Sequence, residues 1–195
     1  MPAILDGTGA GFRAKVNSLN QLKTSSVSED AEAFATDLGD AYQIVSGRLT
    51  LTTANPSAVL YVQNLDVRNF VLDRVVLVCG TSTGGAGNDW GFQTQRNPTG
   101  GTIISTANPA GVSNSNHSSA QTPNSINYAG DGTALTLTGG TGVTLPIRDS
   151  IAARQTFPLG RVLGQGASIG WVVTPPSGNT SCDVVVVAHL YYQQG

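Results

Sequence analysis

Apolar and polar residues alternate in short runs over most of the chain after residue 45. In the run 47–53, Leu49 and Leu51 alternate with polar residues, which is the two-residue period of a strand with one buried face. Glycine, proline and asparagine separate the runs, and no segment here has a persuasive period of 3.6 residues. The pattern predicts strands over 47–53, 58–64, 70–79, 89–96, 102–106, 133–138, 151–157, 167–174 and 182–192.

The last of these runs, 182–192, is apolar at nearly every position, which is typical of a central strand covered on both faces. Short strands separated by glycine and proline turns favour two packed antiparallel sheets. We therefore expect an all-β fold, an antiparallel jelly-roll-like β-sandwich of about eight strands, over residues 46–195. The stretch 157–160, Phe-Pro-Leu-Gly, is expected to bend the chain.

The beginning of the chain has a different pattern. Phe12, Ala14 and Val16 alternate with polar residues, and the alternation continues after a turn at 17–20. The stretch 11–26 is therefore predicted to form a hairpin or an extended ribbon.

A short helix is predicted to begin near 28–34, with Ser28 as its N-cap. A hairpin by itself is only marginally stable in water. We therefore interpret residues 1–45 as an extended N-terminal arm that needs support from the sandwich or from another subunit.

A long polar tract, 107–127, interrupts the runs of strands. It contains five serines and three asparagines between residues 113 and 125 and almost no hydrophobic side chain. Such a tract is either an exposed loop or a ribbon packed against a neighbour.

The composition excludes several classes of protein. Charged residues make up 11% of the chain, against about 25% in a typical soluble domain. The net charge is −2 and lysine occurs only at Lys15 and Lys23, so we expect no binding to nucleic acid through counterion release. No apolar run reaches about 18 residues, and the first ten residues lack the pattern of a signal peptide, so we expect no membrane partner.

The glycine-rich stretch 7–12 invites comparison with a phosphate-binding loop. A dinucleotide-binding fingerprint needs a strand before it and a helix after it, whereas only five residues precede Asp6 and the following residues alternate like a strand. No Gly-Lys-Ser/Thr follows either. We therefore expect no nucleotide and no other cofactor, and interpret these glycines as positions of close backbone approach.

Candidate catalytic and metal-binding residues are sparse. His117 lies in the polar tract, His189 lies in the last predicted strand, and no Gly-x-Ser-x-Gly elbow accompanies them. Cys79 and Cys182 lie in apolar runs without the paired spacing of a zinc site, so they are expected to be buried thiols, although a disulfide stays open. We predict no catalytic and no metal-binding residue.

Two further groups of polar residues are candidates, one for surface ion pairs and one for a ligand site. Asp66 with Arg68, and Asp73 with Arg74, have the spacing of surface ion pairs. Trp90, with Asn88 and Asp89, is the one candidate for a carbohydrate site, against the alternative that this tryptophan packs in the core.

Three stretches together carry a resemblance to a known group. These are the N-terminal G-x-G-F-R-A-K-V, which ends at Val16, then the A-Y-Q-I and G-R-L-T-L-T segments between residues 41 and 52, and A-V-L-Y-V-Q-N at 58–64. The chain resembles structural proteins of tailed bacteriophages, among them capsid decoration (cement) proteins. The segment 184–192 resembles the closing strand of their jelly rolls.

The resemblance implies a non-enzymatic protein of the virion, made in the host cytoplasm and bound to the outer capsid surface. It would stabilise the shell by bridging major capsid proteins, and it would associate with itself, as a trimer rather than a dimer. The residues expected to contact the capsid or a sister subunit are in the arm: Phe12, Arg13, Lys15, Val16, Leu22 and Lys23. A tail, baseplate or head-fibre component and a carbohydrate-binding module are the alternatives.

Overall fold

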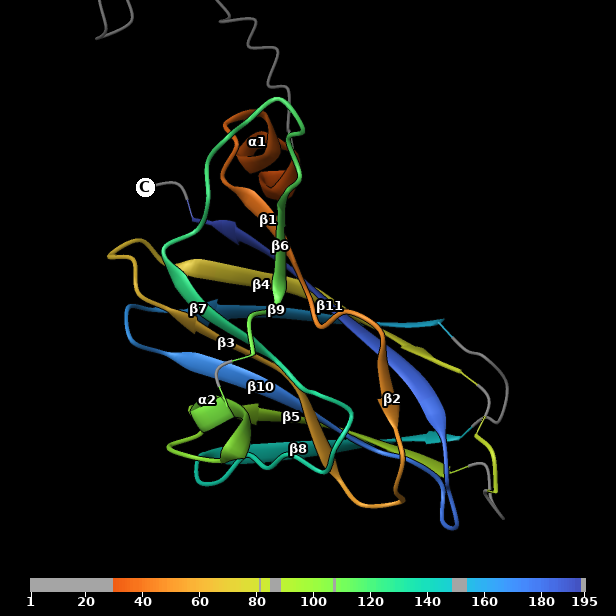
Figure 1. Cartoon of the computed structure of the whole chain (residues 1–195). Helices are drawn as coiled ribbons and strands as arrows, with labels where there is room; N and C mark the ends of the chain where they lie inside the picture. Colours follow the sequence, from red (N-terminus) through yellow and green to blue (C-terminus); the bar gives the residue numbers. More distant parts are fainter. Residues whose placement is uncertain (1–29, 81, 85–88, 107, 149–153, 194–195) are drawn as a thin grey trace, which may run out of the picture. The chain divides into compact units, whose positions relative to one another are not determined.

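Figure 1 shows the computed structural model of the chain, which describes residues 30–80, 82–84, 89–106, 108–148 and 154–193. The elements belong to a compact unit that begins at Ala31. In chain order they are α1 (Ala31–Asp37), β1 (Ala41–Val45), β2 (Leu49–Leu51), β3 (Ser57–Asn64), β4 (Phe70–Cys79), β5 (Asp89–Arg96), α2 (Thr102–Thr106), β6 (Gly111–Asn114), β7 (Ser125–Ala129), β8 (Thr141–Arg148), β9 (Arg154–Leu163), β10 (Ser168–Thr174) and β11 (Cys182–Tyr192).

The strands form two antiparallel sheets that face each other (Figure 1). The first, which we call the β11 sheet, has the order β6-β1-β11-β4-β9, and β2 also pairs with β11. The second, the β10 sheet, has the order β7-β3-β10-β5-β8. The predicted antiparallel sandwich is thus confirmed.

The pairing of the strands is nested. Apart from β2, β6 and β7, the first strand pairs with the last, the second with the last but one, and so on: β1 with β11, β3 with β10, β4 with β9 and β5 with β8. Such nesting is that of one long hairpin rolled into two sheets, which is a jelly roll. The rolling also places β11 beside β4 and β10 beside β5.

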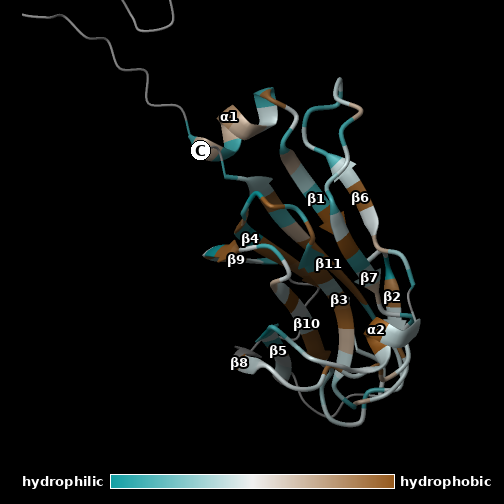
Figure 2. Ribbon diagram, turned by 90° about the vertical axis from the view of Figure 1, so that its left-hand side faces the viewer, coloured by the Kyte–Doolittle hydropathy of each residue, from teal (hydrophilic) through white to brown (hydrophobic). Residues whose placement is uncertain are grey.

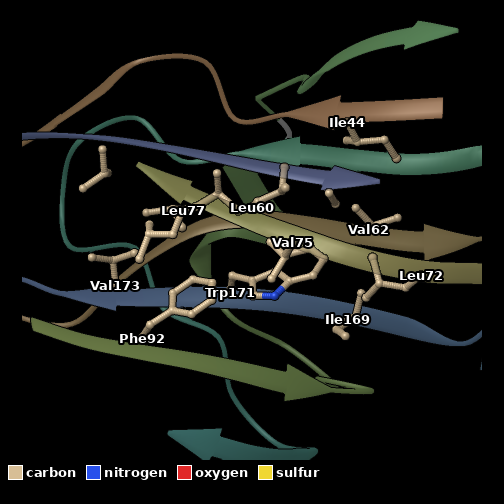
Figure 3. Close-up of a cluster of buried hydrophobic side chains, with 14 of the residues drawn as sticks. Ile44, Leu60, Val62, Leu72, Val75, Leu77, Phe92, Ile169, Trp171 and Val173 are labelled. Carbon is tan, nitrogen blue, oxygen red and sulfur yellow. The ribbon is translucent and has the colours of Figure 1, made fainter. Parts of the chain in front are cut away.

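The space between the sheets is filled by apolar side chains (Figure 3). Trp171 lies at the centre, with Phe92 and Leu60 nearby, and all three are completely buried. A side chain of the size of tryptophan removes about 150–250 Å² from water. At about 25 cal/mol per Å², this stabilises the fold by about 4–6 kcal/mol before the entropy of ordering is subtracted.

The residues between β5 and β8, 97–140, form an insertion into the jelly roll. Its strand β6 pairs with β1 in one sheet, and its strand β7 pairs with β3 in the other. The backbone links the two, since the Ala110 N–H donates to the Asn127 carbonyl at 3.0 Å. The insertion therefore covers the strands β1 and β3, and leaves β9 and β8 as the edges on the opposite side.

The same insertion covers the outer face of the β10 sheet. Ile103 of α2 and Leu135 pack there on Ala58, Tyr61 and Val172, which form a second apolar cluster. Figure 2 shows α2 beside β3 and β7, the two strands of the β10 sheet that it contacts. The β10 sheet is consequently buried on both faces along β3 and β10.

The prediction of a strand over 102–106 was wrong, because these residues form α2. Ile103 is fully buried against the β10 sheet, and Ser105 and Thr106 donate their hydroxyl groups back to carbonyls of the same turn. Burial of one apolar side chain outweighs the weak preference of isoleucine and threonine for strands.

The prediction of a strand over 133–138 was also wrong in its pairing. Leu135 and Leu137 do face the apolar cluster, as the alternation indicates. The position beside β3, however, is occupied by β7, so this run crosses the outer face of the sheet. One backbone bond joins it to β3, from the Ala58 N–H to the Leu135 carbonyl at 2.7 Å. Its other bonds are within the insertion: the Thr136 N–H donates to Thr102 Oγ1 at 2.8 Å, and Thr138 pairs with Gly100.

Three other expectations differ in detail. The stretch 157–160 does not end its strand but lies inside β9, where the register against β4 shifts between Leu72 and Arg74 as in a β-bulge. The strand β11 alternates between buried and half-buried residues, so only one of its faces lies in the core. Strand β1 lies before the expected boundary at residue 45, because its pairing with β11 and β6 makes it part of the sandwich.

Candidate functional site

The contact residues expected from the resemblance are Phe12, Arg13, Lys15, Val16, Leu22 and Lys23, and they lie outside the described residues. The glycine-rich stretch 7–12 and the helix cap Ser28 lie outside them as well. The described surfaces that could serve a function are therefore those of the sandwich and of α1.

The polar tract packs against its own sandwich rather than extending as a free ribbon. After β6, the Asn116 N–H donates to Asn114 Oδ1 at 2.8 Å, and the Ser118 N–H donates to Asn116 Oδ1 at 3.0 Å. These side chains replace backbone partners in successive tight turns, which asparagine favours. His117 lies exposed at the tip of this loop.

The same two asparagines bind the end of α1. Asn114 Nδ2 donates to the Gly39 carbonyl at 2.7 Å, and Asn116 Nδ2 donates to the Asp37 carbonyl at 3.2 Å. The last carbonyls of a helix have no partner within the helix. The polar tract therefore satisfies them and fixes α1 to the sandwich.

Arg74 of β4 holds α1 on the outer face of the β11 sheet. Its Nη1 donates to Glu32 Oε2 at 2.6 Å and its Nη2 to Glu32 Oε1 at 3.1 Å, so the guanidinium binds both carboxylate oxygens. The neighbouring Asp73 is a second partner, at 2.6 Å, as the sequence predicted. Ala35, three positions after Glu32 and therefore on the same side of the helix, is buried.

His189 completes this group. Arg74 Nη2 lies 3.2 Å from His189 Nδ1, and since a guanidinium can only donate, Nδ1 must accept and carry no proton. Burial and the neighbouring Arg74 cation lower the pKa of His189 below its ordinary value near 6.5. The histidine is therefore a neutral part of the α1 attachment.

Arg68 forms a second attachment, just after α1. Its Nη1 lies 3.0 and 3.1 Å from the two oxygens of Asp40, and its Nε lies 3.6 Å from Asp66. The guanidinium also lies over the Tyr192 ring, 3.9 Å from its centre. Arg68 thus ties together the entrance to β1, the β3–β4 connection and the end of β11.

Three arginines of the described chain differ from these, because their side chains bond to no residue that the structure describes. They are Arg96 at the end of β5, and Arg154 and Arg161 on β9. All three lie toward the sheet edges formed by β8 and β9.

Two of them line one hollow, which we call the arginine hollow. It has a volume of about 350 Å³ and lies where β5 and β9 end and β8 and β10 begin. Arg96 and Arg161 line it together with apolar residues, among them Val162, whose side chain is 57% exposed. A hollow with two cations and an apolar wall suits an anionic group attached to an apolar one.

Helix α1 presents an acidic and apolar surface, whereas the arginine hollow is cationic. Phe34 is 44% exposed and Leu38 is 46% exposed, and Asp37 between them is exposed as well. Residues 34, 37 and 38 lie on one side of a helix because they are three and four positions apart. We call this surface of Phe34, Asp37 and Leu38 the α1 face.

Sequence reasoning missed both surfaces. One signal for the arginine hollow was present, because Arg96, Arg154 and Arg161 have no acidic neighbour within two positions, unlike Arg68 and Arg74. Only the sheet topology, however, brings Arg96 and Arg161 to the same hollow.

The carbohydrate site at Trp90 is contradicted by its burial. The side chain is 4% exposed and packs in the interior between the sheets, so a sugar cannot stack on the ring. The alternative that Trp90 is a core residue is confirmed.

The two cysteines are free thiols in the interior. Burial raises the pKa of Cys79 to about 12 and that of Cys182 to about 11, so both are protonated at neutral pH. A buried thiol of this kind reacts slowly.

Within the described ranges, no group of three or more histidine, cysteine and acidic side chains is arranged to hold a metal ion. None of the helices in these ranges has the length and apolar character of a membrane span.

Comparison with known proteins shows little. No family model matches the chain, and no curated protein matches it. One solved structure with which it aligns is that of deformed wing virus carrying the GFP gene, at 11% identity over 89% of this chain and 90% of that chain. The TM-score of 0.23 is too low for this likeness to carry any argument.

Proposed function

We propose that the protein is a non-enzymatic structural component of a tailed-bacteriophage virion. It binds the outside of the capsid and stabilises the shell by bridging major capsid proteins. The resemblance to phage decoration proteins, which is best over the first 65 residues, suggests this role. The observation that supports it best is the way in which the sandwich holds the segment that follows residues 1–29.

That segment is attached to the sandwich at three successive points. Arg74 binds Glu32 in α1, Arg68 binds Asp40 after the helix, and β1 then enters the sheet between β6 and β11. Because β1 is hydrogen-bonded on both sides, a pull on the residues before it must shear two ladders of hydrogen bonds at once. An arm bound to a capsid would therefore transmit force to a rigid module.

The contacts of such an arm would act together. Once one contact of the protein with the shell has formed, every other one is intramolecular, which raises the avidity without any strong single contact. A cement protein needs this property because it must bridge several capsid subunits.

Binding to shells tests the proposal. Shells of the encoding phage, free of DNA and stripped of this protein, are mixed with the full chain, with a chain lacking residues 1–26, and with Phe12→Ser/Val16→Ser/Leu22→Ser. We expect the full chain to sediment with the shells at a fixed ratio, and both variants to bind at least about tenfold more weakly through lost multivalency.

Two controls accompany this measurement. Arg154→Gln changes a surface charge of the sandwich and is expected to bind like the unmodified chain. Circular dichroism must show that the shortened chain keeps its strands, which we expect because the compact unit starts at Ala31. If the shortened chain binds as tightly as the full chain, the proposed role of the arm is wrong. If the full chain does not bind to shells, the proposed capsid role is wrong.

The alternative of a tail, baseplate or head-fibre component differs in copy number. A cement protein covers the shell in many copies, whereas a tail component is present in few. Quantitative mass spectrometry of intact particles, with the major capsid protein as the internal standard, separates the two.

A further inference from the structure

We propose that two copies of this protein associate head to tail, with the α1 face of one copy bound in the arginine hollow of the next. This inference concerns the folded sandwich and does not depend on the proposed role at the capsid.

The positive charge of the arginine hollow favours an acidic group as its ligand. Arg96 and Arg161 line it, and neither side chain bonds to a residue that the structure describes. The other described arginines near acidic residues are all in ion pairs: Arg48 with Asp183, Arg68 with Asp40, and Arg74 with Glu32. Two cations beside one hollow repel each other, and a carboxylate between them would relieve that repulsion.

The occupant must also have an apolar part. Val162 is 57% exposed at the hollow, and the buried Leu163 and Ile169 contribute to its wall. Its volume, about 350 Å³, is at the small end for a ligand pocket, and therefore suits one or two anchoring side chains rather than a whole helix.

The chain itself carries a surface with these properties. Five of its twelve acidic residues lie within 29–40, so this short stretch is its most acidic part. Arg74 and Arg68 bind Glu32 and Asp40, whereas Asp37 projects from α1 beside the exposed Phe34 and Leu38. The α1 face therefore offers the carboxylate and the apolar side chains that the hollow requires.

The two surfaces lie on different parts of the sandwich. Figure 1 shows α1 at the top, whereas the strand ends that line the hollow lie at the left. Arg74 and the asparagines of the polar tract hold α1 in place, so its face cannot enter the hollow of its own chain. A contact between two different patches is heterologous, and it closes into a ring or extends as an open chain.

The mixing of two complementary variants tests this geometry. Arg96→Gln/Arg161→Gln disables the hollow and keeps the α1 face. Asp37→Asn/Leu38→Ser disables the α1 face and keeps the hollow. Full-length proteins are studied by sedimentation and native mass spectrometry at low salt.

The expected results are specific to a heterologous contact. The unmodified chain associates as its concentration rises, and association weakens at high salt because exposed charges are screened. Each variant alone associates several-fold more weakly, because the exposed ion pairs of the contact are lost. An equimolar mixture forms a 1:1 complex, twice the 20.0 kDa of one chain, and nothing larger, because each variant keeps one complementary surface.

The control is Arg154→Gln, which removes an arginine of β9 that bonds to no described residue and does not line the hollow. It is expected to associate like the unmodified chain. Each of the following results overturns the inference: an unmodified chain that stays monomeric at about 1 mM, where even weak contacts form; association that survives Arg96→Gln/Arg161→Gln; a mixture that forms no complex; or an equal loss in Arg154→Gln. A monomeric chain that still binds shells would leave the proposed function standing.

Discussion

The outer faces of the two sheets are covered to different extents. On the β10 sheet, Tyr61 and Val172 lie buried beneath Ile103 and Leu135 of the insertion. On the β11 sheet, Val45 and Val187 lie side by side on β1 and β11, yet both stay half-buried, and Val78 is exposed. The short helix α1 contacts this sheet, at β1 and β11.

The comparison shows that an outward apolar residue has two different roles in this molecule. On the β10 sheet it belongs to a second core, so it stabilises the fold. On the β11 sheet it borders solvent and the attachment of α1, so it contributes less to stability and stays accessible to partners. Substitutions on the two faces should therefore have unequal consequences.

The largest effect is expected on the covered face. Ile103→Ala should lower the free energy of unfolding by about 2–5 kcal/mol, because it leaves a cavity beneath α2 that the neighbouring side chains fill only in part. Urea denaturation measures the change.

Val187→Ala on the open face is the matched comparison, and it should cost about 1 kcal/mol or less because the side chain is half-exposed. Equal costs for the two substitutions would contradict the difference between the faces.

A smaller effect is expected at the attachment of α1. Arg74→Gln removes both bonds to Glu32, and since the arginine side chain is 34% exposed, the loss should be about 1 kcal/mol. The change should be local, so hydrogen exchange of residues 31–37 should accelerate while the core strands keep their protection.

Arg48→Gln is its control, because the pair of Arg48 with Asp183 is exposed and distant in sequence from α1. Exchange that is unaltered in α1 after Arg74→Gln would show that the salt bridge does not hold the helix.

The smallest effect is expected from protonation of His189. The fold lowers its pKa through burial and through Arg74, while Glu32 and Asp73 act in the opposite sense and Arg154 adds to the lowering. Just below pH 6.5, His189 is therefore protonated in the unfolded chain but still neutral in the folded chain. Stability should be complete above this pH and fall as the pH drops from 6.5 toward the folded pKa.

His189→Gln should remove this part of the acid sensitivity. The unfolding midpoints of the two proteins are compared at pH 8, where the histidine is neutral in both states, and again at pH 5. The unfolding midpoint of the variant, relative to that of the unmodified chain, should be higher at pH 5 than at pH 8. A pH dependence identical in the two proteins would rule out this role of His189.

Much of the fold could be predicted from the sequence because its strongest signals are local. The alternation in 47–53, the apolar run 70–79 and the closing run 182–192 each correspond to a strand. The predictions failed at 102–106 and 133–138, both in the insertion. There the apolar side chains pack on the outer face of the β10 sheet, whose strand β3 already pairs with β7. The alternation of apolar residues therefore indicated which side chains are buried, but not a paired strand.

At the candidate surfaces, too, contacts between neighbouring residues could be predicted and contacts between distant residues could not. Ion pairs between neighbours, such as Asp73 with Arg74, were predicted from spacing alone and are present. The arginine hollow was not, because Arg96 and Arg161 are 65 positions apart in the sequence. The expected contact residues from Phe12 to Lys23 stay a prediction, since they lie outside the described residues.

The sequence by itself determined that this protein is an all-β sandwich with few charges, because strand periodicity and composition are properties of neighbouring residues. Tertiary structure decided the nested pairing of the strands, which sheet face is covered, and which arginines come together at one hollow. Each of these depends on contacts between residues far apart in the chain, and a local sequence pattern carries no information about such contacts.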